Sequence, residues 1–215
     1  NYKKKFDNAN KMLLRDASNL NNKVTPINKY KSPSVGYIGS IYEGRGIDII
    51  IKLSQILKNI DFHIIGGEEK IIKKIKNNHN YNNLIFHGYL NYRESIIKMK
   101  EFDILIAPYQ TNTKVPGGSN TSKWMSPIKL FEYMSAKKPI ITSNLVSLKE
   151  FMIDKHNCLI VNEESIDQWK NAIIDLLKNK SLYNKIVDNA FNDLKSKYTW
   201  DIRVKKIIEY YEMCL

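Results

Sequence analysis

Short apolar runs alternate with longer amphipathic stretches from about residue 34 onward. The runs are rich in β-branched residues, as buried strands are, and lie at 35–38, 62–65, 84–86, 104–107, 140–142 and 158–161. The stretches between them predict helices at 46–57, 68–76, 91–100 and 127–136, with a shorter one near 147–152. Alternation of this kind predicts an α/β fold with a parallel sheet of about six strands and helices on both faces.

The two ends of the chain follow a different pattern. The last fifty residues predict three helices, for which Ser165, Ser181 and Thr199 are suitable N-cap residues. Residues 1–33 are polar and rich in Asn and Lys, and we expect a linker or edge segment there with one helix around 6–15. The sequence thus predicts one folded domain over residues 34–215.

One stretch, SPIKLFEYMSAKKPIITS from Ser126 to Ser143, combines a helix, a sharp stop and a buried strand. Ser126 is a good N-cap, and Pro127 suits the first helical position because its missing N–H costs nothing there. Lys137 and Lys138 are expected near the negative end of the helix, and Pro139 stops it. Side chains on a helix lean toward its N-terminus, where free amides hold anions. The carboxylate of Glu132 is therefore predicted to lie beside this anion site. An anion site next to an acceptor for hydroxyl groups suits a phosphate attached to a ribose.

Unusual residues follow four of the predicted strands at the point where each strand ends. They are 39–46, Gly66 and Gly67, His87 with Gly88 and Tyr89, and 108–124. In open parallel sheets, ligands bind beyond the carboxyl ends of the strands. The sequence therefore predicts one ligand site built from these segments. Two interpretations of the long polar loop 110–124 are open: a sugar-facing flap that orders on binding, or a disordered segment.

The segment GSIYEGRG, residues 39–46, is close to a phosphate-binding P-loop but lacks its lysine and its hydroxyl residue. Without the hydroxyl there is no protein ligand for Mg²⁺, which argues against an NTPase. The loop can still present amides to a diphosphate, and Arg45 can bind its oxygens with a planar fork. The other interpretation of Arg45 is a solvated arginine on a glycine turn.

The net charge of the chain bears on which partners it can bind. Lys and Arg number 34 against 22 Asp and Glu, a net charge of +12. Two interpretations are open: attraction to nucleic acid, phosphorylated substrates or an anionic membrane, or lysines scattered over solvated faces.

Cys158 and Cys214 form neither a disulfide framework nor a metal site, and the histidines share no ligand spacing. The chain opens on Asn1 without an apolar signal stretch, so we expect part of a longer protein, cytoplasmic or peripheral at the inner membrane face.

The stretch from Ser126, together with GYIGSIYEGRGID, FHIIGGEEK, LIFHGYL, DILIAPYQ and YTWDIRVKKI, resembles a known family. It is similar to family 4 of the retaining glycosyltransferases with two Rossmann domains, the GT-B fold, in the donor-binding half. The resemblance covers the chain from about Pro33 to the C-terminus. It implies a Rossmann-like doubly wound sheet that forms the C-terminal half of a GT-B fold, with the acceptor pocket on a missing N-terminal domain.

The resemblance also implies roles for individual residues. Arg45 matches a basic residue that contacts the donor diphosphate, and Glu132 matches the glutamate that binds the ribose hydroxyls, so both are candidate catalytic residues. Further candidate donor contacts are Gly39, Ser40, Gly66, His87, Gly88, Tyr89, Ser126, Ile128 and Lys129. His87, Gly88 and Tyr89 match the loop beneath the nucleobase, while Ser126, Ile128 and Lys129 would offer first-turn amides to the distal phosphate.

Three departures from the family pattern bear on the donor. Ser40 stands where the family has a second arginine, so fewer charges meet the diphosphate. Trp124 replaces the first glutamate of the Glu-x7-Glu pattern that Glu132 closes, which removes the usual carboxylate contact to the sugar. Lys137 replaces the glycine that the family has after the helix, and a non-glycine residue in such a left-handed cap costs about 1 kcal/mol.

By resemblance, the chain binds a UDP-, GDP- or ADP-sugar and takes part in the transfer of a hexose-type sugar to a glycan or lipid-linked acceptor in polysaccharide biosynthesis. No metal and no separate cofactor are required. A GT-B epimerase or phosphorylase half is an alternative. From another class, a basic Rossmann-like module for nucleic acid is an alternative, although the lysines are dispersed and no nucleic acid is expected.

Overall fold

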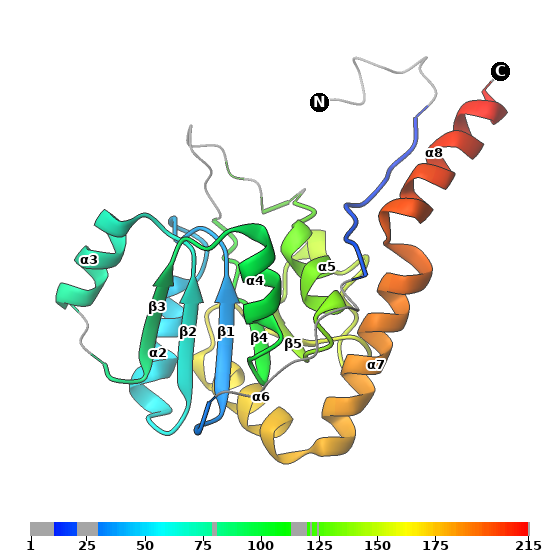
Figure 1. The fold of residues 1–215 in the computed structure, drawn as a ribbon. Coiled ribbons are helices and arrows are strands. Elements are labelled where there is room, and N and C mark those ends of the chain that lie inside the picture. Colours follow the sequence, from blue (N-terminus) through cyan, green and yellow to red (C-terminus); the bar gives the residue numbers. More distant parts are fainter. Residues whose placement is uncertain are drawn as a thin grey trace.

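The structure is a computed structural model that describes residues 11–20, 30–78, 81–112, 120, 122–123 and 125–214 (Figure 1). A six-stranded parallel sheet lies at the centre of this described part, in the order β3-β2-β1-β4-β5-β6. The strands are β1 Ser34–Ile38, β2 Asp61–Ile65, β3 Leu84–Gly88, β4 Ile104–Ala107, β5 Ile140–Ser143 and β6 Leu159–Val161. The six predicted apolar runs are thereby confirmed as the six strands.

Helices cover both faces of the sheet, as the alternation predicts. They are α2 Ile47–Ile56, α3 Glu69–Asn78, α4 Tyr92–Met99, α5 Ile128–Ser135, α6 Ile166–Lys178 and α7 Lys180–Lys197, and a further helix, α8 Trp200–Met213, follows them. α2, α3 and α6 pack into one apolar core, and α4, α5 and α7 pack into a second core on the opposite face. Side chains of β4 alternate between the two cores, with Ile104 and Ile106 in one and Leu105 and Ala107 in the other. Burial on both sides explains the continuous apolar runs.

Several helix boundaries differ from the prediction. Ser165 and Thr199 do cap α6 and α8, but Asn179 rather than Ser181 caps α7, because its side chain accepts a hydrogen bond from the Leu182 amide at 3.0 Å. The short helix near 147–152 is a 3₁₀ turn, Val146–Leu148. Residues 11–15 are not helical, and the rest of the helix expected at 6–15 lies outside the described residues.

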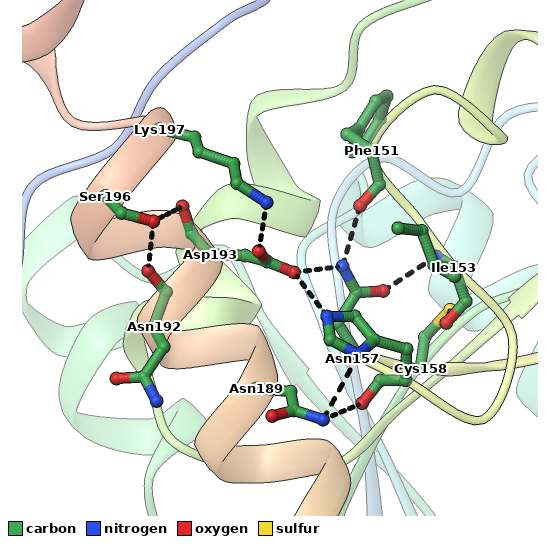
Figure 2. Close-up of polar contacts among 10 residues, drawn as sticks. Phe151, Ile153, Asn157, Cys158, Asn189, Asn192, Asp193, Ser196 and Lys197 are labelled. Atoms are coloured by element: carbon green, nitrogen blue, oxygen red, sulfur yellow. Dashed lines mark hydrogen bonds and ion pairs between the residues drawn. The ribbon is translucent and has the colours of Figure 1, made fainter.

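A buried polar network fixes the loop before β6 against α7 (Figure 2). The Asn157 side chain accepts from the Ile153 amide at 2.7 Å and donates to the Phe151 carbonyl at 2.8 Å and to Asp193 at 2.9 Å. Lys197 donates to the same carboxylate at 2.6 Å. Burial opposes ionisation of Asp193, but the bonds from Lys197 and Asn157 prevail and lower its pKa. The network orients the end of α7, from which α8 continues.

The segment 11–20 packs on the start of α8. The Ser18 amide donates to the Tyr198 carbonyl at 3.0 Å, and the Arg203 guanidinium donates to the Arg15 carbonyl. α8 itself has no buried residue and extends away from the sheet (Figure 1). None of the described helices is both long and apolar enough to cross a membrane. The predicted domain boundary near Ser34 stays a prediction.

Candidate functional site

The site lies where the strand order reverses, between β1 and β4. At this switch point Tyr133 of α5 joins the two strands: its hydroxyl accepts from the Ile38 amide at 2.9 Å and donates to the Ile106 carbonyl at 3.4 Å. The ring is fully buried. α5 is therefore fixed over the crevice in which α/β sheets bind ligands. Sequence reasoning missed this role of Tyr133; the available signal was a tyrosine on an apolar helix face, whose hydroxyl needs a partner when buried.

Glycines join the ends of β1, β2 and β3. The Gly39 amide donates to the Ile65 carbonyl at 2.9 Å, and the Gly66 amide donates to the Gly88 carbonyl at 2.7 Å. Gly66 has φ 105°, and a Cβ atom there would lie 2.4 Å from the Gly39 carbonyl oxygen. Only glycine permits this approach of backbone to backbone.

A cavity of about 760 Å³ opens above these glycines. Five of the predicted donor-binding residues line it, namely Gly39, Ser40, Gly66, Gly88 and Tyr89. Glu68, Leu90 and Ser95 contribute to the same wall, and Tyr89 is exposed at its edge. The volume is in the range of small-molecule sites, about 300–1,000 Å³.

The charged side chains of Arg45, Lys129 and Glu132 gather around Tyr109. The Lys129 Nζ lies 4.0 Å from the centroid of the Tyr37 ring and 5.1 Å from that of Tyr109. The Arg45 Cζ lies 5.5 Å from the Tyr109 centroid, and its Nε is buried with no hydrogen-bond partner among the described residues. A Cβ atom on Gly39 would lie 2.5 Å from the Lys129 Nζ, so Lys129 borders the same glycine that lines the cavity.

The pKa shifts reflect this crowding. Burial lowers the pKa of the Lys129 ammonium well below its ordinary value, and Arg45 lowers it further while Glu132 opposes the change. Burial raises the pKa of Glu132, against the pull of Lys129. Two basic groups thus face one carboxylate in a poorly solvated place. Together with the unpartnered Nε of Arg45, this arrangement is suited to an anion.

The loop that carries Arg45 is held by close backbone packing. Gly46 stands in the left-handed region with φ 77°, directly before α2, and a Cβ there would lie 1.9 Å from the Pro108 carbonyl oxygen. The Gln110 amide donates to the Gly44 carbonyl at 2.9 Å. The residues after β1 and after β4 are thereby tied together, as the shared location of the motifs predicts. Most of the expected flap 110–124, Trp124 included, lies outside the described residues.

Two predicted contacts are placed differently. α5 begins at Ile128 with Pro127 as the cap residue, so Ser126 is not the N-cap; its hydroxyl instead accepts from the Asp16 amide at 3.0 Å. His87 lies within β3 and is not among the residues that line the cavity, because its ring contacts the buried His63 at 2.9 Å on the neighbouring strand.

The residue that follows the cap of α5 has the expected conformation. Lys137 does adopt the predicted left-handed conformation, with φ 55°. Among the described residues, no group of three or more His, Cys, Asp and Glu side chains could hold a metal ion.

The chain belongs to the glycosyl transferases group 1 family, whose model matches residues 21–193. It is 26% identical over 183 residues to an uncharacterized glycosyltransferase of Methanocaldococcus jannaschii. The aligned residues cover 82% of this chain and 44% of that protein. A second uncharacterized glycosyltransferase of the same organism is 24% identical over 180 residues, or 82% of this chain and 47% of that protein. The chain thus spans about half the length of these relatives.

Solved structures share the fold at low sequence identity. Sucrose-phosphate synthase from Thermosynechococcus elongatus aligns with a TM-score of 0.79 at 14% identity, over 99% of this chain and 55% of that one. HepE of Anabaena in complex with UDP-glucose aligns with a TM-score of 0.70 at 14% identity, over 85% and 49%. The C-terminal domain of the group 1 protein LpcC from Francisella tularensis aligns with a TM-score of 0.60 at 20% identity, over 79% and 89%. The fold is therefore the Rossmann-like C-terminal domain of a GT-B glycosyltransferase.

Proposed function

We propose that this chain is the nucleotide-sugar-binding half of a retaining glycosyltransferase that transfers a hexose-type sugar to a glycan or lipid-linked acceptor. The observation that carries the proposal is the meeting of Arg45, Lys129 and Glu132 around Tyr109. Lys129 also borders Gly39, which lines the 760 Å³ cavity. The complex of HepE with UDP-glucose supports a nucleotide sugar as the class of ligand.

In this proposal the nucleoside occupies the cavity, with the base toward Gly88 and Tyr89. The diphosphate lies against Gly39, where Arg45 and Lys129 supply positive charge. Glu132 accepts hydrogen bonds from the ribose hydroxyls, because a carboxylate offers two acceptor oxygens to two vicinal donors. The first-turn amides at Ile128 and Lys129 add to the anion site.

The chemical contribution of this half is charge stabilisation. When the bond between the sugar C1 and the phosphate oxygen breaks, the electron pair stays on that oxygen and the leaving diphosphate gains negative charge. Basic groups already positioned at the diphosphate stabilise this charge without reorganising. We therefore assign the neutralisation of the leaving group to Arg45 and Lys129, and we expect a chelator to leave donor binding unchanged. Transfer itself needs the acceptor, which we assign to a further domain.

Calorimetry with a panel of UDP-, GDP- and ADP-sugars tests the proposal. We expect one of them to bind, and Arg45→Gln to weaken its binding by roughly tenfold to a hundredfold, as expected for loss of a charge-assisted hydrogen bond. Arg93→Gln is the matched control, because Arg93 is an exposed arginine on α4 that does not line the cavity. If no nucleotide sugar binds the wild-type chain, the proposal is wrong.

The cellular setting belongs to the same proposal. A net charge of +12 suits a peripheral contact with an anionic membrane surface on the cytoplasmic side, where a lipid-linked acceptor in polysaccharide biosynthesis would lie. Sedimentation with vesicles that contain anionic lipid, at low and at high salt, measures this contact directly. Equal recovery with neutral and anionic vesicles would contradict it.

A further inference from the structure

The cavity above the glycines has an apolar wall and an acidic rim. Its wall includes the side chains of Ile38, Ile65 and Leu90. Of the described residues that line the cavity, only Glu68 and Glu69 are acidic and none is basic, and both acids are exposed. A flat and largely apolar base finds a suitable surface on this wall, and the rim offers it carboxylate oxygens.

The two acids of the rim differ in their partners. The Glu69 carboxylate pairs with the Lys73 Nζ at 2.7 Å, one turn further along α3. The Glu68 carboxylate has no hydrogen-bond or ion-pair partner in the part of the chain that the structure describes. Its backbone is fixed nonetheless, because the Glu68 carbonyl accepts from the Ile71 and Ile72 amides at 3.0 Å each and so begins α3. Glu68 is therefore an anchored acceptor that is left for a ligand.

Glu68 also lies close to the proposed place of the base. The Gly66 amide donates to the Gly88 carbonyl at 2.7 Å, which joins the ends of β2 and β3. Glu68 follows Gly66 by two residues and Tyr89 follows Gly88 directly, and both line the cavity. Tyr89 is 83% exposed, so its ring is available for a base to pack on. A base on Tyr89 therefore shares one cavity with the Glu68 carboxylate.

The three candidate bases differ in what they offer to a carboxylate, which accepts hydrogen bonds through two oxygens and donates none. Guanine offers its N1–H and its N2 amino group side by side, so both oxygens can be satisfied at once. Adenine offers one amino group beside the acceptor N1. Uracil offers only its N3–H, between two carbonyl oxygens that a carboxylate repels. A free carboxylate at the rim thus favours guanine and disfavours uracil.

We propose that Glu68 is a specificity-determining residue that selects guanine, so that the donor of this chain is a GDP-sugar. This inference rests on the proposed function, because the base belongs to the same nucleotide sugar. Glu68 takes no part in the breaking of the C1–O bond; it decides which nucleotide the cavity accepts.

Calorimetry of the wild-type chain with GDP, IDP (inosine diphosphate), ADP and UDP tests the selection. The four probes share the diphosphate, so differences in affinity report on the base, and IDP differs from GDP only in lacking the N2 amino group. We expect GDP to bind about tenfold or more tightly than each of the other three. Tighter binding of UDP or ADP, or equal affinity for GDP and IDP, would overturn the inference and leave the proposed function intact. Absence of binding by all four and by every nucleotide sugar would overturn the proposed function itself.

Glu68→Gln separates selection of the base from folding. Its amide accepts from the uracil N3–H and donates to a carbonyl oxygen, so UDP should gain affinity while the preference for GDP over IDP disappears. The ratio of GDP to UDP affinity should fall by about tenfold, whereas a folding defect would weaken all four probes alike. Glu69→Gln is the matched control, because it removes the same charge from the same rim at an acid that is already paired with Lys73, and both ratios should persist. Unchanged ratios in Glu68→Gln would overturn the inference.

Discussion

Replacement of Gly66 by alanine tests whether the floor of the cavity is built as described. Gly66 has φ 105°, and its added Cβ would lie 2.4 Å from the carbonyl oxygen of Gly39. That oxygen belongs to the backbone and is held by the bond from the Gly39 amide to Ile65, so it cannot move aside as a side chain would.

The expected loss of stability has two parts. A non-glycine residue in such a sparsely populated region costs about 1–3 kcal/mol. The clash adds the cost of overpacking, also about 1–3 kcal/mol. Gly66→Ala should therefore lower the free energy of unfolding by about 2–6 kcal/mol. With a slope of about 2–3 kcal/mol per M urea, the midpoint should fall by about 1–3 M.

Gly88→Ala is the matched control. Gly88 ends the neighbouring strand β3 and also has a positive φ, 70°, but an added Cβ would meet no atom of the described part of the chain within 4 Å. Only the conformational cost remains, about 1–2 kcal/mol. Urea unfolding of both variants, followed by circular dichroism, measures the difference. Equal midpoints would refute the close approach of the two strand ends.

Two further predictions concern stability. Tyr133→Phe leaves the half-buried Ile38 amide without the acceptor at 2.9 Å and should cost about 1–3 kcal/mol. Tyr211→Phe on the exposed α8 should be neutral. Similar midpoints for both variants would contradict the bridge at the switch point. Burial, together with His87 and Lys98, lowers the pKa of His63 to about 4, below its ordinary value of 6.5. The unfolded chain therefore binds the proton first, so stability should fall as the pH drops below 6.5, by about 2 kcal/mol at pH 5 relative to pH 7. Urea midpoints at the two pH values should show this loss, and His63→Leu should lack most of it; an unchanged loss in that variant would refute the assignment.

The fold could be predicted from sequence because its signals are local. Each strand is a short apolar run buried on both sides, and each interruption carries glycine, proline or a polar cap. At two helix starts the prediction is wrong because another hydrogen-bonding group, near or distant in the chain, is available. Asn179 starts α7 before Ser181 can, and Ser126 gives its hydroxyl to the distant Asp16 amide.

The candidate site could be predicted only in outline. Its segments share the carboxyl edge of the sheet, and that rule brought Gly39, Gly66 and Gly88 to one cavity. The hydroxyl bridge of Tyr133, the ring contact between His63 and His87, and the place of Lys129 between two tyrosines all join residues far apart in the chain. Neither periodicity nor spacing contains that information.

A crystal structure of the chain grown with UDP and GDP offered together would test the central claim most directly. The account predicts one nucleotide, with its diphosphate in contact with Gly39, Arg45 and Lys129, its ribose hydroxyls on Glu132 and its base in the cavity near Tyr89. A nucleotide bound elsewhere, or a diphosphate that touches neither Arg45 nor Lys129, would contradict it.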